Sequence, residues 1–186
     1  MKVRDIMTQT PVCCGRETNL GAAVELLWIH NCGMLPVVDG NKKLIGIVTD
    51  RDFCIALGTR NRLPGDLTVG DVATARVISC KADDEIHVAL GTMADHQVRR
   101  LPVVDGDGVP RGILSMDDVL VHADQNKWEG SCELSSEEVI RSIKKMRGQQ
   151  FPIIHHPKPA ARATVLPREA SVGPRPINLR PRQNPV

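Results

Sequence analysis

The chain has 186 residues, a formal net charge of +2 at pH 7 and an apolar share of 41%. Aromatic residues make up only 2% and Tyr is absent, which argues against a surface that stacks nucleic-acid bases. No run of 18 or more apolar residues occurs and the N-terminus lacks the apolar segment of a secretory signal, so we expect a cytoplasmic protein with no membrane span.

The first copy of an internal repeat begins near Val3 and leads to a capped helix. Thr18 or Asn19 can cap this helix, whose apolar positions recur with helical spacing at Leu20, Ala23, Val24, Leu27 and Trp28. A strand then follows at LPVVDG, a hairpin turn at 41–43 and a second strand at LIGIVT. We expect a second helix over 50–57.

The same elements recur in the second copy, because LPVVDG occurs at 35–40 and again 66 positions later at 101–106. At that offset VRDIMT aligns with VGDVAT, and GIVTDRD aligns with GILSMDD, without a gap. Asp84 is the expected cap of a helix with apolar positions Ile86, Ala89, Leu90, Met93 and Ala94. A hairpin through 107–110 and a helix over 116–123 complete the copy.

Each copy therefore predicts a short strand, a helix, a hairpin and a helix, which is a small α/β (α+β) sandwich. A unit of about 55 residues is marginal alone, whereas two units packed together approach an ordinary core. We expect repeat 1 over 1–60, a connector over 61–67 and repeat 2 over 68–126. The functional site should lie between the two copies.

The remaining chain predicts an accessory helix over 134–148 and a tail over 149–186. Ser135 and Glu138 form a capping box, and Gly148 follows the last helical turn of an amphipathic pattern. Such a helix should pack on the body or on a partner. The tail is rich in Pro and Arg, which is typical of disorder.

The repeated motifs resemble a known family. An apolar-Pro-Val-Val-Asp strand combined with a G-apolar-apolar-[ST]-x-x-D junction, present twice, resembles a tandem pair of cystathionine β-synthase (CBS) domains, a Bateman module. The resemblance covers about Lys2 to Ala123. It implies a stand-alone regulatory module with pseudo-two-fold related repeats, an adenosine-containing ligand such as AMP, ADP or ATP in the clefts between them, a homodimer, and a protein partner regulated in trans.

The [ST]-x-x-D turns also have a direct physical interpretation. Thr49 with Asp52, and Ser115 with Asp118, place a hydroxyl at the end of a strand and a carboxylate in the first helical turn. A helix N-terminus attracts phosphate, and a carboxylate can accept hydrogen bonds from both ribose hydroxyls. The alternative is an ordinary capping box that needs no ligand.

The resemblance carries over to two sets of residues. The first site would use Thr49 and Asp52 with the backbone of Leu35, Pro36 and Val37 and a strand near Val12. The second would use Ser115 and Asp118 with Leu101, Pro102 and Val103 and a strand near Ile78.

Three arginines are the candidates to neutralise phosphate: Arg51, Arg99 and Arg100. Their alternative role is solvated surface charge. Asp117 stands in the second copy where Arg51 stands in the first, so we expect the second site to accept fewer phosphates or none.

Other classes of function have less support. The chain contains no His-Glu-x-x-His, no G-x-S-x-G and no glycine-rich phosphate loop, so we expect neither an enzyme nor a catalytic cofactor. A metal or redox sensor would use residues such as Cys13, Cys14, Cys32, Cys80, His30 and His96, but successive residues of a strand face opposite ways, so Cys13 and Cys14 cannot easily chelate together. A protein-interaction scaffold without a ligand and weak polyanion binding by the tail remain alternatives, and nucleic acid is not the expected partner.

Overall fold

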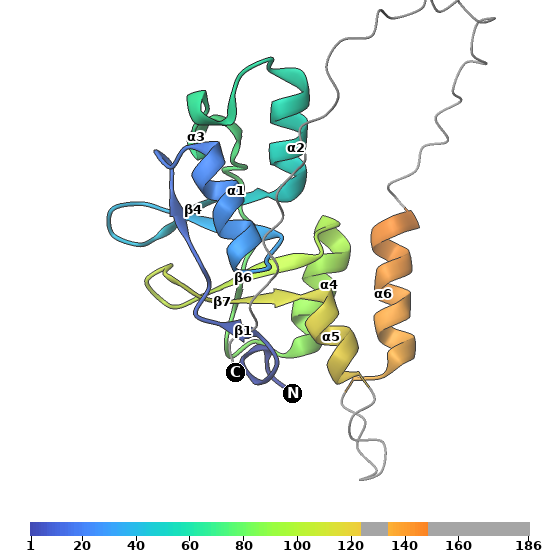
Figure 1. Ribbon diagram of the computed structural model, residues 1–186. Helices are drawn as coiled ribbons and strands as arrows, with labels where there is room; N and C mark the ends of the chain where they lie inside the picture. The colour runs from blue at the N-terminus through green and yellow to red at the C-terminus, as the bar shows by residue number, and fades with distance from the viewer. Residues whose placement is uncertain (124–133, 149–186) are drawn as a thin grey trace, which may run out of the picture. The chain divides into compact units, whose positions relative to one another are not determined.

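The computed structural model describes residues 1–123 and 134–148, all within one compact unit, Met1–Pro152. Figure 1 shows the elements in chain order. These are η1 Val3–Asp5, β1 Thr8–Gln9, β2 Cys14–Gly15, α1 Leu20–Ile29, β3 Met34–Val38, β4 Leu44–Thr49, α2 Asp50–Thr59, η2 Pro64–Asp66, α3 Val69–Val72, β5 Cys80–Lys81, α4 Ile86–His96, β6 Arg100–Val104, β7 Pro110–Ser115, α5 Met116–His122 and α6 Ser136–Gly148. The tail predicted over 149–186 lies outside the described residues.

Two small sheets form the centre of the fold, one for each hairpin. The first has the strand order β2-β3-β4 and the second the order β1-β7-β6-β5. In the first, β3 pairs antiparallel with β4, with Leu35 opposite Val48. In the second, β6 pairs antiparallel with β7, with Leu101 opposite Leu114. The registers are identical at the offset of 66, so the sequence repeat is also a structural repeat, as predicted for a pair of α/β units.

The leading segment of each copy is exchanged into the other copy. Strand β1 pairs with β7, placing Thr8 opposite Ile113. The equivalent bridge in the other direction joins Thr74 to Ile47, with two hydrogen bonds of 2.9 and 3.1 Å. Val3 is accordingly buried in the second core and Val69 in the first. Each repeat therefore contributes its leading residues to the core of the other repeat.

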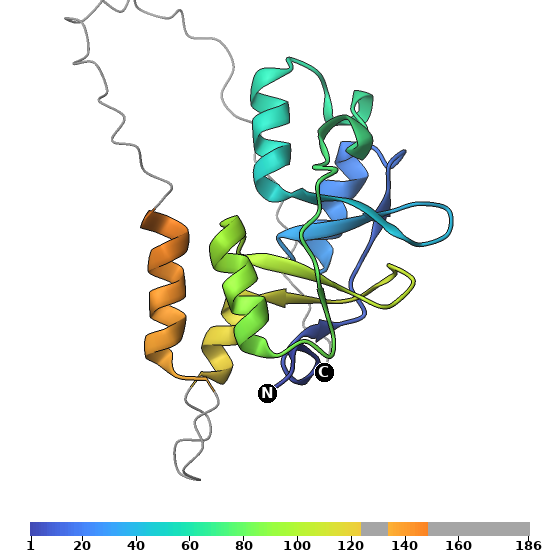
Figure 2. The same cartoon turned by 180° about the vertical axis from the view of Figure 1, so that it is seen from behind.

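Helix α6 packs against the second repeat, beside α4 and α5 (Figures 1 and 2). Its apolar side chains Val139 and Met146 are 0% and 5% exposed. Lys145 on α6 forms an ion pair with Asp95 on α4. The capping box predicted at Ser135 is present, since its amide and hydroxyl donate to the Glu138 carboxylate at 3.1 and 3.0 Å. The predicted accessory helix is thus confirmed, and it docks on its own chain.

The two equivalent helices α1 and α4 differ in burial, and one predicted cap was wrong. Val24 and Trp28 are 40% and 62% exposed, although their equivalents Leu90 and Ala94 are buried. The physical reason is α6, which covers α4, whereas among residues 1–123 and 134–148 the first copy has no equivalent helix. Glu85, and not Asp84, is the N-cap of α4.

The Asp84 carboxylate instead accepts from the amide of Lys81 at 2.8 Å. In α1 the cap is Asn19, whose side chain accepts from the amide of Ala22 at 2.8 Å. Within residues 1–123 and 134–148, no helix combines the length and apolar character needed to cross a membrane.

Candidate functional site

Both [ST]-x-x-D turns form complete capping boxes at the junction of a strand and a helix. The amide and hydroxyl of Thr49 donate to Oδ2 of Asp52 at 2.8 and 2.7 Å. Those of Ser115 donate to Oδ2 of Asp118 at the same distances. No described residue donates to Oδ1 of either carboxylate, so each retains an oxygen that can accept a hydrogen bond from a ligand hydroxyl. Capping and ligand binding are therefore compatible at these turns.

A cavity of about 240 Å³ opens at the second turn, and we call it the Ser115 pocket. Its lining from the second copy is Arg100, Ile113, Ser115, Asp117 and Asp118. Its lining from the first copy is Thr8, His30, Asn31, Cys32, Gly33 and Met34. A ligand here would touch both repeats, because the 30–34 segment ends α1 and starts β3 of the other copy. Typical pockets for drug-sized ligands begin near ~300 Å³, so this cavity suits a small ligand.

Arg100 reaches across the boundary between the repeats within the Ser115 pocket. A Cβ atom placed on Gly33 would lie 3.1 Å from a terminal guanidinium nitrogen of Arg100. Glycine therefore leaves the space that this guanidinium fills. The pKa of the Cys32 thiol is raised by burial, with the Arg100 charge and backbone hydrogen bonds acting in the opposite direction.

A second cavity, of about 420 Å³, lies where the start of α2, the loop after α4 and the end of α6 meet, and we call it the Arg51 pocket. It is lined by Arg51, Gln97, Arg99, Met116, Ile143, Met146 and Arg147. The structure thus separates two neighbouring arginines, since Arg99 lies in this pocket and Arg100 in the other. Arg99 lies in the bend before β6, whereas Arg100 is the first residue of the strand.

The predicted residues of the first site are not gathered in the same way. The Arg51 pocket contains neither Thr49 nor Asp52. Asp52 instead lines a smaller hollow of about 160 Å³ between α2 and α3, together with Arg60 and Val72. Sequence analysis did not assign the segment at His30 or the end of α6 to a nucleotide site, because neither carries a nucleotide-binding motif.

The apolar motif residues of both copies belong to the cores. Leu35 and Val37 are 0% and 1% exposed, and Leu101 and Val103 are both 0% exposed. Pro36 and Pro102 are buried as well. These side chains cannot reach a ligand, so only their backbone remains a candidate for contact.

The strands predicted near Val12 and Ile78 begin later than expected. Both residues are partly buried but lie two positions before β2 and β5, in segments without regular structure. Each packs against a core cluster, Val12 against the first and Ile78 against the second.

Two equivalent cysteines, Cys14 and Cys80, are buried. Burial raises the pKa of Cys14 to about 11 and that of its equivalent, Cys80, to about 12. A high thiol pKa lowers the fraction of reactive thiolate. Residues 1–123 and 134–148 contain no group of three or more His, Cys, Asp or Glu side chains that could hold a metal ion.

Comparison with known proteins places these features in a family. The model described as CBS domain matches residues 3–59 and 69–124. Uncharacterized protein MK0525 of Methanopyrus kandleri is 32% identical over 117 residues, which are 63% of this chain and 57% of that protein. Hypoxic response protein 1 of Mycobacterium tuberculosis is 33% identical over 119 residues, which are 64% of this chain and 82% of that protein.

Solved structures agree. The CBS domain pair of protein MJ0100, in complex with 5′-methylthioadenosine and S-adenosyl-L-methionine, matches with a TM-score of 0.59 and 28% identity over 64% of this chain and 92% of that chain. CBSX2 in complex with AMP matches with a TM-score of 0.59 and 31% identity over 68% and 98%. Hypoxic Response Protein I with two coordinated zinc ions matches with a TM-score of 0.58 and 32% identity over 66% and 98%.

Proposed function

This chain belongs to the CBS-domain family as a tandem pair, and we propose that it is a regulatory module that binds an adenosine-containing ligand between its repeats. The three ligands in the similar structures, 5′-methylthioadenosine, S-adenosyl-L-methionine and AMP, share the adenosine moiety. The same moiety would suit a site that offers a carboxylate to ribose hydroxyls and a partly apolar wall to a base.

The observation that carries the proposal is the composition of the Ser115 pocket. Asp118 offers a free carboxylate oxygen to the ribose hydroxyls, and the partly exposed Ile113 offers apolar surface to the base. Asp117 and Asp118 make the turn acidic, and Arg100 is the guanidinium in this lining. We expect this pocket to favour a nucleoside or a ligand with few phosphates, in line with the exchange of Arg51 for Asp117 between the copies.

Regulation would follow from the position of the pocket between the two repeats. A ligand that touches the 30–34 segment and the Ser115 turn binds best to one relative arrangement of the repeats. It therefore shifts the population toward that arrangement by its difference in affinity. We propose that a protein partner in trans detects this change.

We also propose that the chain forms a homodimer through α1. Val24 and Ile29 on this helix are 40% and 63% exposed, while Leu90, the equivalent of Val24, is buried beneath α6. In such a dimer, a second copy of the chain would cover α1 of the first repeat, as α6 covers α4 of the second repeat. Light scattering at micromolar concentration tests this, and a monomer would contradict it.

A thermal-shift panel of adenosine, AMP, ATP and S-adenosylmethionine tests the ligand. At one hundred times its dissociation constant a ligand stabilises by about 2.7 kcal/mol. That corresponds to roughly 5–10 °C for a chain of this length. We expect Asp118→Ala to remove the shift that adenosine or AMP causes, measured from the melting temperature of the unliganded variant.

Asp71→Ala is the matched control. Asp71 accepts from the amide and hydroxyl of Thr68 at 2.8 and 2.9 Å, so it forms the same capping box outside the Ser115 pocket. This control should keep the full shift. An unchanged shift in Asp118→Ala, or no shift of the wild type by any ligand, would refute the proposal.

A further inference from the structure

The Arg51 pocket is lined by cations without a matching anion. Its titratable side chains are Arg51, Arg99 and Arg147, and no carboxylate is among its lining residues. None of the three guanidinium groups forms an ion pair with a carboxylate of the described chain. Three like charges around one cavity repel one another, and a multiply charged anion would relieve that repulsion.

The two pockets are equivalent surfaces of the two repeats with opposite charge. At the offset of 66, Asn31 in the Ser115 pocket corresponds to Gln97 in the Arg51 pocket. Gly33 likewise corresponds to Arg99, and Asp117 corresponds to Arg51. The small residue and the acid of the Ser115 pocket are thus replaced by two arginines in the Arg51 pocket. The repeat explains why a cavity exists at both places, and the substitutions indicate that the two cavities bind different chemical groups.

Helix α6 completes the Arg51 pocket. Ile143 and Met146 line its apolar side, where Met116 is 2% and Met146 5% exposed. Arg147, one residue further along, supplies the third guanidinium. Helix α6 lies beyond residue 124, where the match to the family model ends, so this contribution comes from outside the matched domain pair. The same turn of the helix therefore packs on the body and presents a cation to the cavity.

We propose that the Arg51 pocket binds a polyphosphate group and that α6 closes the site through Arg147. Phosphate oxygens accept bidentate hydrogen bonds from guanidinium groups, and three arginines match a diphosphate or triphosphate better than a single phosphate. The expected source of the polyphosphate is an adenosine nucleotide such as ATP, bound separately from the ligand of the Ser115 pocket, and this part rests on the proposed function; a free inorganic polyphosphate offers the same chemistry.

Coupling between the ligand and α6 follows from this geometry. If the docked helix supplies part of the binding site, the ligand binds the docked state more tightly than the undocked state. By linkage, ligand binding then stabilises the docking of α6 by the same factor. Helix α6 is in this way an output of the module, because a partner that binds the undocked helix would compete with the polyphosphate.

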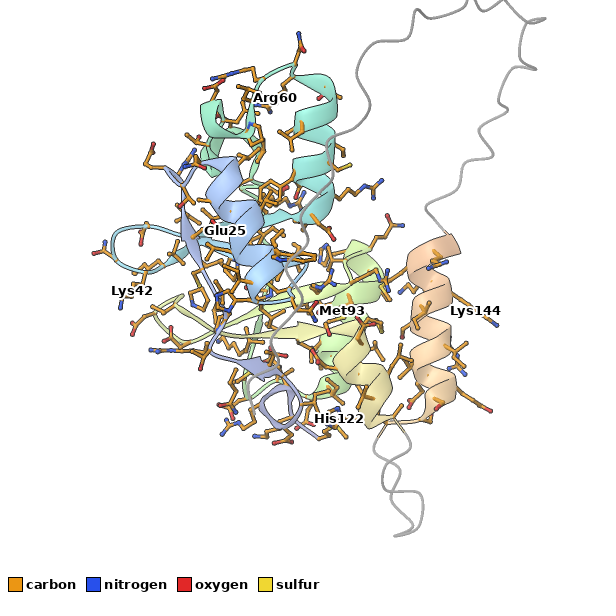
Figure 3. The ribbon with its side chains drawn as sticks, viewed as in Figure 1. Glu25, Lys42, Arg60, Met93, His122 and Lys144 are labelled. Carbon is orange, nitrogen blue, oxygen red and sulfur yellow. The ribbon has the colours of Figure 1, made fainter. Side chains whose placement is uncertain are left out.

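Calorimetric titrations of the full chain with ATP, AMP, adenosine and inorganic tripolyphosphate test the proposal at low ionic strength. Arg147→Gln removes the cation, and Lys144→Gln is the matched control, because Lys144 lies on the same helix and points away from α4 (Figure 3). We expect Arg147→Gln to weaken ATP binding by about tenfold, because one charge-assisted contact is lost, and to leave the affinity for adenosine unchanged. The control should change ATP affinity by less than about twofold.

Hydrogen exchange supplies the second measurement. ATP should slow exchange of the α6 amides in the wild type and not in Arg147→Gln. Equal ATP affinities of the wild type and Arg147→Gln would overturn the proposal. So would hydrogen exchange in α6 that does not respond to ATP. Adenosine binding that depends on Asp118 would in that case leave the proposed function intact. Tripolyphosphate binding through Arg147 without any binding of adenosine would instead support the polyphosphate site and refute the adenosine function.

Discussion

Substitution of Gly112 tests whether the exchange of leading segments holds the two repeats together. Gly112 lies in β7 opposite Gln9 of β1. A Cβ atom at this position would lie 2.7 Å from Sδ of Met7 and 2.9 Å from the backbone oxygen of Thr8. The methionine side chain can move, but the backbone oxygen can move only if β1 moves. Gly112→Ala must therefore push the first copy's leading strand away from the second sheet.

The expected cost can be worked from these contacts. Overpacking of a filled site costs about 1–3 kcal/mol, and each kcal/mol lowers the melting temperature by about 2–4 °C at this chain length. Gly46 is the matched control at the equivalent position, where a Cβ would lie 3.2 Å from the backbone oxygen of Thr74. Neither glycine has a positive φ angle, so backbone strain does not confound the comparison.

Thermal melts followed by circular dichroism provide the assay. We expect Gly112→Ala to melt about 2–12 °C below the wild type, and Gly46→Ala to melt between the two. Because Thr8 also lines the Ser115 pocket, Gly112→Ala should weaken binding of the ligand at Asp118. A Gly112→Ala protein as stable as the wild type would show that β1 does not hold the repeats together.

Three further outcomes follow from the structure. The ion pair with Lys145 on α6 lowers the pKa of Asp95. Its contribution to stability is therefore present above the unfolded pKa of about 4 and is lost as pH falls through the folded pKa. Asp95→Asn should lower the melting temperature at pH 7 and not at pH 2. Alkylation at pH 8 followed by mass spectrometry should modify exposed Cys54 well before buried Cys80, whose pKa is raised to about 12, and equal rates would contradict that burial. Leu90→Ala should lower the free energy of unfolding, measured with denaturant, by about 2–5 kcal/mol, whereas Val24→Ala at the equivalent position should lower it by less than about 1 kcal/mol in the monomer. Similar losses for the two variants would contradict the coverage of α4 alone by α6.

Much of the fold could be predicted because each pattern occurs twice. Two apolar runs separated by a turn predict a hairpin, and the predicted strand LIGIVT coincides with β4 Leu44–Thr49. The exchange of Val3 and Val69 between the cores could not be predicted. A strand of two residues such as β1 has no periodicity, and the same apolar residue fits either core.

The candidate site was predictable only where one local motif carries it. The [ST]-x-x-D turns place Ser115 and Asp118 together because both residues lie within one helical turn. The division of Arg99 from Arg100 depends on where the bend ends and β6 begins. Arg147 joins Arg51 only through the docking of α6, about a hundred residues away along the chain.

Under the proposed function, the different linings of the two repeats would allow a pseudo-symmetric fold to respond to more than one signal. Two equivalent clefts with identical linings would bind the same ligand and would report a single concentration. Here the exchange of Arg51 for Asp117 makes one cleft cationic and the other acidic, and α6 covers α4 while α1 remains exposed. Because β1 and the Ile47–Thr74 bridge join each repeat to the other, we expect a change of arrangement at one cleft to be transmitted to the other. A nucleoside in the Ser115 pocket and a polyphosphate in the Arg51 pocket would therefore act on one equilibrium, with the docking of α6 as the property that both of them change.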